Sequence, residues 1–131
     1  MKVSAWIVPF LIALAAGGGI GGARIFAAPS FSRDFGPAEA GGRPESVRMV
    51  VRGLKCVDTA RTLAGQFEGV PGVIRYVAYA SRNEARVTYD GAVTGPQALE
   101  EAVEGPVFVP GTGEILFHQF EVVSIQDEPI R

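Results

Sequence analysis

Two stretches of the chain alternate apolar and polar residues, which is the pattern of a β-strand with one buried face. They are residues 46–52 and 84–89, and a more continuously apolar stretch, residues 73–80, predicts a third strand between them. Every second residue of the alternating stretches forms their apolar side: Val47, Met49, Val51, Ala85, Val87 and Tyr89. We therefore expect these side chains to lie in one core.

Two further stretches repeat apolar residues every three or four positions, as one face of an α-helix does. They are residues 59–67 and 94–104, and glycine and proline at positions 69–72 follow the first of them. In the second stretch, Thr94 is suited to cap the helix and Pro96 to occupy its first turn. The apolar stripes consist of Ala60, Leu63, Ala64, Phe67, Leu99, Ala102 and Val103.

A turn at residues 81–83, a loop at residues 105–114 and a last strand at residues 115–125 complete the pattern. The resulting order is β-α-β-β-α-β, which is typical of the ferredoxin-like α+β sandwich. We predict that residues 46–131 form this domain, with a four-stranded antiparallel sheet covered on one face by two helices.

The N-terminal part of the chain has a different pattern, because residues 3–23 contain no charged side chain. That length is about what an α-helix needs to cross a bilayer. A cleaved signal peptide with Ala13-Leu14-Ala15 as its small-x-small site is the alternative, but the apolar run continues beyond that site. We interpret residues 1–26 as a transmembrane anchor or signal segment and favour a single-pass signal-anchor in the cell membrane, with the folded domain outside the cytoplasm.

Small residues dominate the chain from the end of this segment to the start of the predicted domain. Gly17 and Gly21 have the small-xxx-small spacing that lets two membrane helices approach closely, which would allow a homodimer; a glycine-rich helix end without a partner is an equally open alternative. Residues 27–45 are rich in Pro, Gly, Ala and Ser and show no apolar period. We predict a flexible linker there rather than a packed element.

Composition narrows the range of functions. With 131 residues the chain has room for one core, its formal net charge of -2 does not favour a nucleic-acid partner, and its one cysteine excludes an internal disulfide. That residue, Cys56, and the one histidine, His118, fall short of the four ligands of a structural zinc site. We do not expect an enzyme, because these two residues are the sole candidate nucleophile–base pair and no phosphate-cradling loop is present.

Several short motifs resemble the heavy-metal-associated (HMA) domain family, which includes copper chaperones, metal-binding modules of copper-transporting ATPases and periplasmic mercury-binding proteins. They occur in the family's order within residues 47–105 and are Gly53-Leu54-Lys55-Cys56, Gly72-Val73, residues 85–90 and residues 99–103. The resemblance implies a ferredoxin-like fold and the binding or delivery of a soft metal such as copper or mercury, with a metal-transport protein as partner.

The sequence departs from the family at the metal motif. The family binds metal with Cys-x-x-Cys, whereas here Thr59 follows Cys56 at the position of the second cysteine. A Thr hydroxyl is a poor ligand for Cu(I) or Hg(II), which prefer thiolates. In this fold Cys56 opens the first helix, where backbone N–H groups, the helix dipole and Lys55 stabilise a thiolate and Asp58 opposes it.

Four interpretations of Cys56 remain open. It donates one thiolate to a soft metal while another chain or a partner protein donates the second ligand. Alternatively His118, which lies near the start of the last strand at the same end of the sheet, completes the site, although strand alternation favours a core or edge position for it. Cys56 can also be a redox-sensitive thiol. In the last interpretation it is a small remnant without function, and the domain is a non-catalytic accessory subunit of a membrane complex.

The exposed face of the predicted sheet is rich in arginine. By alternation it carries Arg48, Arg52, Arg75, Tyr79, Arg86 and Thr88. A solvated polar face is one interpretation, and docking to an acidic protein partner or to anionic lipid through the four arginines is the other. RNA is not expected, because this face lacks the repeated aromatic residues on which bases stack.

Overall fold

The computed structural model describes residues 7–14, 28–37, 42–108 and 111–129. Ten elements lie between residues 31 and 128 in these ranges. In chain order they are β1 (Phe31–Asp34), β2 (Pro44–Arg52), α2 (Val57–Gln66), β3 (Val73–Tyr79), the 3-10 turn η1 (Ala80–Arg82), β4 (Glu84–Asp90), α3 (Pro96–Glu104), β5 (Val107–Phe108), β6 (Ile115–Phe117) and β7 (Glu121–Glu128).

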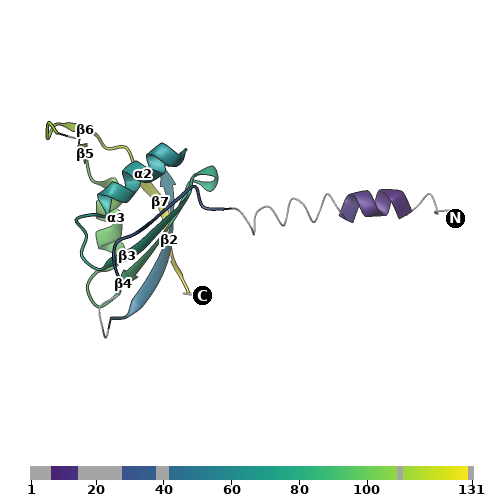
Figure 1. The fold of residues 1–131 in the computed structure, drawn as a ribbon, viewed down its shortest axis with the longest axis horizontal. Helices are drawn as coiled ribbons and strands as arrows, with labels where there is room; N and C mark the ends of the chain where they lie inside the picture. The colour runs from purple at the N-terminus through teal and green to yellow at the C-terminus, as the bar shows by residue number, and fades with distance from the viewer. Residues whose placement is uncertain (1–6, 15–27, 38–41, 109–110, 130–131) are drawn as a thin grey trace.

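Five of the strands form one antiparallel sheet in the order β1-β3-β4-β2-β7. Without β1, the elements β2-α2-β3-β4-α3-β7 follow the predicted β-α-β-β-α-β order, and their strand order is that of a ferredoxin-like sheet. Helices α2 and α3 lie on the same face of the sheet (Figure 1). The predicted α+β class and the antiparallel sheet are therefore confirmed.

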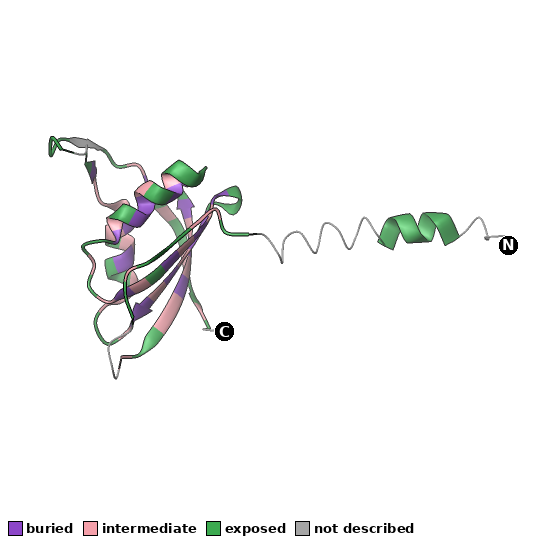
Figure 2. Ribbon diagram, in the orientation of Figure 1, coloured by how far each residue is buried: buried purple, intermediate pink, exposed green. Residues whose placement is uncertain are grey.

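The core lies between the sheet and the two helices (Figure 2). The alternation along the strands places the apolar side chains of β2 and β4 in this core. The side chains expected on the apolar side of β2 and β4 are all at most 1% exposed. The Tyr76 ring packs 5.5 Å from that of Phe67, and its buried hydroxyl donates a hydrogen bond of 3.0 Å to the carbonyl of Ala60. This bond joins β3 to α2, and burial raises the pKa of the Tyr76 phenol.

The predicted linker contains a strand. β1 pairs with β3 at the edge of the sheet, and Phe31 and Phe35 pack against the core. The guanidinium of Arg61 on α2 lies 5.9 Å from the centre of the Phe31 ring, and Arg33 forms an ion pair with Glu68. The prediction of an unpacked tether over residues 27–45 was wrong here, because pairing with β3 and the contacts of Phe31 and Phe35 with the core hold these residues on the sheet edge, and neither shows in a local period. Moreover, β2 begins at Pro44 rather than at residue 46.

The predicted last strand is two separate elements. Its first part, β6, pairs with β5 in a two-stranded sheet, and only β7 joins the main sheet beside β2. Gly111 and Gly113 between β5 and β6 have positive φ angles of 87° and 70°, which suit glycine in a tight reversal. The segment predicted as a loop is therefore half of a hairpin. The start of α3 also differs, because Gly95 rather than Thr94 is its N-cap.

The predicted membrane segment is described only at residues 7–14, which are helical and exposed. The remainder of residues 1–26 and the paired glycines lie outside the described residues. In the part of the chain that the structure describes, no helix has both the length and the apolar character needed to cross a membrane. The anchor stays a prediction.

Gly53 joins β2 to the loop that carries Cys56, and it cannot be replaced freely. Its φ is +99°, and a Cβ atom there would lie 2.4 Å from the carbonyl oxygen of Gln119, just ahead of β7. Because the nearest atom belongs to the backbone, a side-chain rotation cannot relieve this contact. By contrast, a Cβ at Gly65 in α2 meets nothing within 4 Å.

We therefore expect Gly53→Ala to lower the free energy of unfolding by about 2 kcal/mol or more. Gly65→Ala, the matched control, should change it by less than about 1 kcal/mol and in the stabilising direction, because alanine favours the helix. Urea unfolding followed by circular dichroism measures both. Equal stability of the two variants would contradict the close contact between Gly53 and Gln119.

Candidate functional site

The loop that carries Cys56 lies at one end of the sheet, beside the start of β7. Arg52, the last residue of β2, lies opposite Glu121, the first residue of β7, in the pairing of the two strands. Their side chains also form an ion pair. The residues that follow Arg52 therefore lie next to those that precede Glu121, as the contact of Gly53 with Gln119 shows. The prediction that Cys56 and His118 belong to the same end of the sheet agrees with this arrangement.

Cys56 is the N-cap residue of α2, and Thr59 is part of the same cap. Cys56 is extended (φ −150°, ψ 178°) and exposed. The Thr59 hydroxyl accepts hydrogen bonds from the backbone N–H groups of Lys55 (2.9 Å) and Cys56 (3.0 Å) and donates one to the Cys56 carbonyl (2.9 Å). Thr59 is therefore engaged in closing the first turn of the helix.

The thiol of Cys56 lies against the donors of that turn. Its Sγ atom is 3.7 Å from Thr59 Oγ1. The backbone N–H of Thr59, then its hydroxyl and then the backbone N–H of Asp58 lower the pKa of Cys56 below its usual value, while the Asp58 carboxylate opposes them. Hydrogen bonds to the charged form favour it. Cys56 is thus an exposed thiol with enhanced thiolate character.

His118 forms its hydrogen bond with the end of α3 and not with Cys56. Its ring Nδ1 lies 2.8 Å from the backbone carbonyl of Glu104, at the end of α3, so Nδ1 carries the proton in this contact. The ring is exposed and lines an open hollow of about 590 Å³ together with Arg52, Glu104 and residues 119–121. Cys56 does not line that hollow. Within the described ranges, no three Cys, His, Asp or Glu side chains are grouped closely enough to hold a metal ion.

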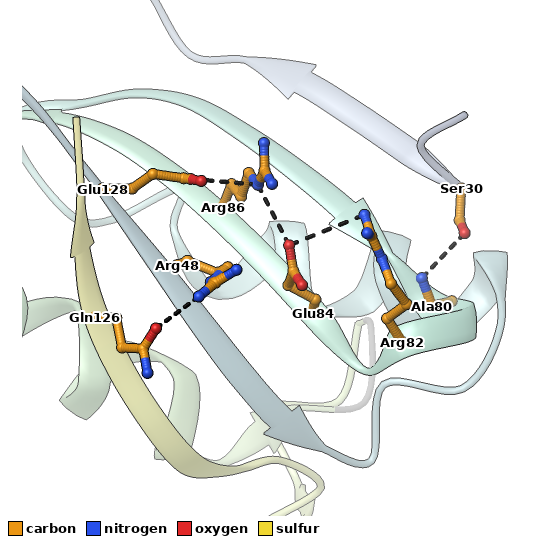
Figure 3. A network of polar contacts seen from close by, with 8 residues as sticks. All are labelled: Ser30, Arg48, Ala80, Arg82, Glu84, Arg86, Gln126 and Glu128. Atoms are coloured by element: carbon orange, nitrogen blue, oxygen red, sulfur yellow. Dashed lines mark hydrogen bonds and ion pairs between the residues drawn. The ribbon is translucent and has the colours of Figure 1, made fainter. Parts of the chain in front are cut away.

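The four arginines predicted to bind a partner are paired within the chain. On the open face of the sheet Arg48 donates to Gln126 (2.6 Å), and Arg86 contacts both Glu84 and Glu128 at 3.3 Å (Figure 3). The other two pairs are Arg75 with Asp34 (3.5 Å) and Arg52 with Glu121. The alternation placed the arginines correctly. Their partners Gln126, Glu128, Asp34 and Glu121 escaped prediction because these residues lie on neighbouring strands whose register only the fold defines, whereas Glu84 lies on β4 itself, two residues before Arg86.

Glu84, the first residue of β4, is a buried acidic residue on this face. It is 8% exposed, and its carboxylate lies 3.3 Å from Arg86 and 4.0 Å from Arg82. Both guanidiniums also lie over the ring of Tyr79, at 4.5 Å for Arg82 and 5.3 Å for Arg86. The positive charge on this face is therefore partly neutralised and held in fixed positions.

Comparisons with known proteins give structural neighbours only. No family model and no curated protein matches the chain. Oxidised MerP from Ralstonia metallidurans CH34 is similar at 28% identity over 47% of this chain and 85% of its own, with a TM-score of 0.44. A copper-binding domain of HMA7, a P-type ATPase, is similar at 16% identity over 65% of this chain and 95% of its own, with a TM-score of 0.48.

The capping contacts predict how substitutions move the pKa of Cys56. Thr59→Ala removes a hydroxyl that stabilises the thiolate, so the pKa rises and the pH profile of alkylation by iodoacetamide shifts to higher pH. Asp58→Asn removes an opposing charge and shifts the profile to lower pH. Thr62→Ala is the matched control, because its hydroxyl bonds the Asp58 carbonyl at 3.0 Å. A profile for Thr59→Ala that coincides with that of the control would refute the assignment.

Proposed function

We propose that this chain is a membrane-tethered, non-catalytic domain that binds a soft metal ion, Cu(I) or a similar cation, through the thiolate of Cys56. The observation that supports it is the exposed thiol at the N-cap of α2, with backbone N–H groups directed at the sulfur. A soft cation prefers a thiolate to any other ligand that this end of the domain offers. The metal ion is here the cargo, which the domain receives and passes on.

One chain supplies half of such a site. Thr59 Oγ1, the nearest side-chain atom that could complete it, has its hydrogen bonds committed to the backbone. The second thiolate therefore comes from another protein, either a second copy of this chain or a metal-transport partner. The exposure of Cys56 leaves the sulfur accessible to it. A homodimer held by the glycines at residues 17–22, with the domains outside the cytoplasm, would bring two such thiols together.

An accessory function is the second candidate, and the same cap favours it. A threonine that closes the helix and an absence of clustered metal ligands among the described residues suit a domain that docks to a membrane complex without metal. Cys56 would then be incidental, and the arginines of the open face would meet an acidic protein.

A Cu(I) competition experiment separates the two. The full chain in detergent micelles is titrated against a chromophoric Cu(I) chelator under reducing conditions. We expect about half a Cu(I) per wild-type chain, because two thiolates share one ion, and none for Cys56→Ser. Thr59→Cys should bind about one Cu(I) per chain and more tightly, because its thiolate replaces a hydroxyl 3.7 Å from Cys56 Sγ.

Thr59→Cys also serves as the positive control. If it binds Cu(I) while the wild-type chain and Cys56→Ser do not, the assay works and the natural chain lacks a metal site. That result would reject a metal site formed by this chain alone or by two copies of it, and would favour the accessory function.

A further inference from the structure

Two arginines lie side by side on the open face of the sheet. Arg48, the middle residue of β2, is the direct register partner of Arg86 on β4, and both strands are inner strands of the sheet. Their Cα atoms are therefore about 5 Å apart. Like charges placed directly opposite each other on neighbouring strands repel and destabilise the sheet. A negative charge beside both of them would offset this repulsion.

The carboxylates of the chain lie against one arginine of this pair. Glu84 and Glu128 both contact the Arg86 guanidinium at 3.3 Å (Figure 3). The Arg48 guanidinium instead donates to the neutral amide oxygen of Gln126 at 2.6 Å. Within the described residues, Arg48 therefore lacks the carboxylate partner that each of the other three arginines of this face has.

Hydroxyl groups lie beside the arginine pair. Ser46 and Thr88 are register partners two residues along the strands from Arg48 and Arg86, so they share the same face. Both line a groove of about 320 Å³ on this face. Glu128 also lines it, with its carboxylate held by Arg86. Neutral donors and an incompletely balanced guanidinium thus lie together, which suits a ligand that carries a carboxylate.

A third arginine of this face is held loosely. Arg75 on β3 also lines the groove, and its guanidinium lies 3.5 Å from Asp34, with side chains 55% and 77% exposed. An exposed ion pair of this kind contributes little, so a carboxylate of a ligand can replace Asp34. β2 and β3 are two strand spacings apart, about 10 Å. An extended segment of about four residues therefore reaches both Arg48 and Arg75.

We propose that the open sheet face binds an acidic, extended segment of a partner protein, with one carboxylate on Arg48 and a second on Arg75. A narrow peptide fits this face better than a flat layer of lipid headgroups, because Arg48 is half-buried in it. This inference rests on the partner docking of the proposed function and names the chemistry of the partner. Because α2 covers the other face of the sheet, a partner bound in this way leaves Cys56 accessible (Figure 1).

Binding of fluorescein-labelled hexaglutamate to the full chain in neutral detergent micelles tests the inference. Fluorescence anisotropy measures the dissociation constant. Arg48→Gln should weaken binding about tenfold, because it removes a charge-assisted hydrogen bond. Arg61→Gln is the matched control, since it removes the same charge from α2. At about 0.15 M ionic strength the charge on that distant face is screened, so the control should change binding by less than about twofold.

Gln126→Glu supplies the missing carboxylate from within the chain. We expect it to raise the midpoint of thermal unfolding and to weaken hexaglutamate binding as much as Arg48→Gln does, because Arg48 is then already paired. Gln97→Glu, at an exposed position of α3, adds the same charge away from this face and should have neither effect.

Three results would overturn the inference. They are no binding of hexaglutamate to the wild-type chain, equal weakening by Arg48→Gln and Arg61→Gln, and unweakened binding to Gln126→Glu. Displacement of the peptide by phosphatidylserine added to the micelles at equal charge would assign the face to anionic lipid and would overturn it as well. Cys56→Ser should bind the peptide as the wild type does, so this experiment fails or succeeds independently of the Cu(I) competition.

Discussion

The contact between the backbone of Gly53 and the carbonyl of Gln119 fixes one whole end of the molecule. It holds the end of β2 against the chain that leads into β7, and these two strands pair over seven residues of β2, as many as β2 pairs with β4. Phe120 beside the contact is buried, and Leu54 on its other side is fully buried. The loop between Leu54 and α2 therefore has little freedom, and Cys56 is presented on a short, anchored segment rather than on a mobile one.

The cap of α2 gives Thr59 a clear physical function. At that position a hydroxyl binds two N–H groups that would otherwise lack partners at the start of the helix. A cysteine sulfur is a weaker acceptor. Replacement of Thr59 by cysteine would therefore weaken the cap of α2 and add a possible ligand for a soft metal ion. The capping also acts on the neighbouring thiol, so Cys56 keeps thiolate character without a second sulfur in the chain.

The sequence predicted what local periodicity encodes and missed what depends on distant pairing. Val47, Met49 and Val51 were assigned to the core because alternation needs no knowledge of the partner strand, and the stripes of α2 and α3 followed for the same reason. β1 has four residues and no period, and its stability comes from β3 and from Arg61, which are distant in sequence. The hairpin of β5 and β6 was read partly as a loop because glycine and proline mask its two short strands. At the site, the cysteine at the helix start was predicted, whereas the bond of His118 to Glu104 depends on where α3 ends.

The two edge strands of the sheet, β1 and β7, affect whether copies of this domain associate strand to strand. β1 offers an edge of only four residues, and β7, which is bonded to β2 alone among the described strands, carries Glu121, Asp127 and Glu128 along its length. Although Arg52 and Arg86 of the same chain pair with Glu121 and Glu128, two β7 edges brought together would still place carboxylates against carboxylates, which resists strand-to-strand association. If the chain is tethered to a membrane, as proposed, it meets its own copies far more often than a chain in free solution does. The acidic edge allows the domain to be crowded without polymerising through its sheets.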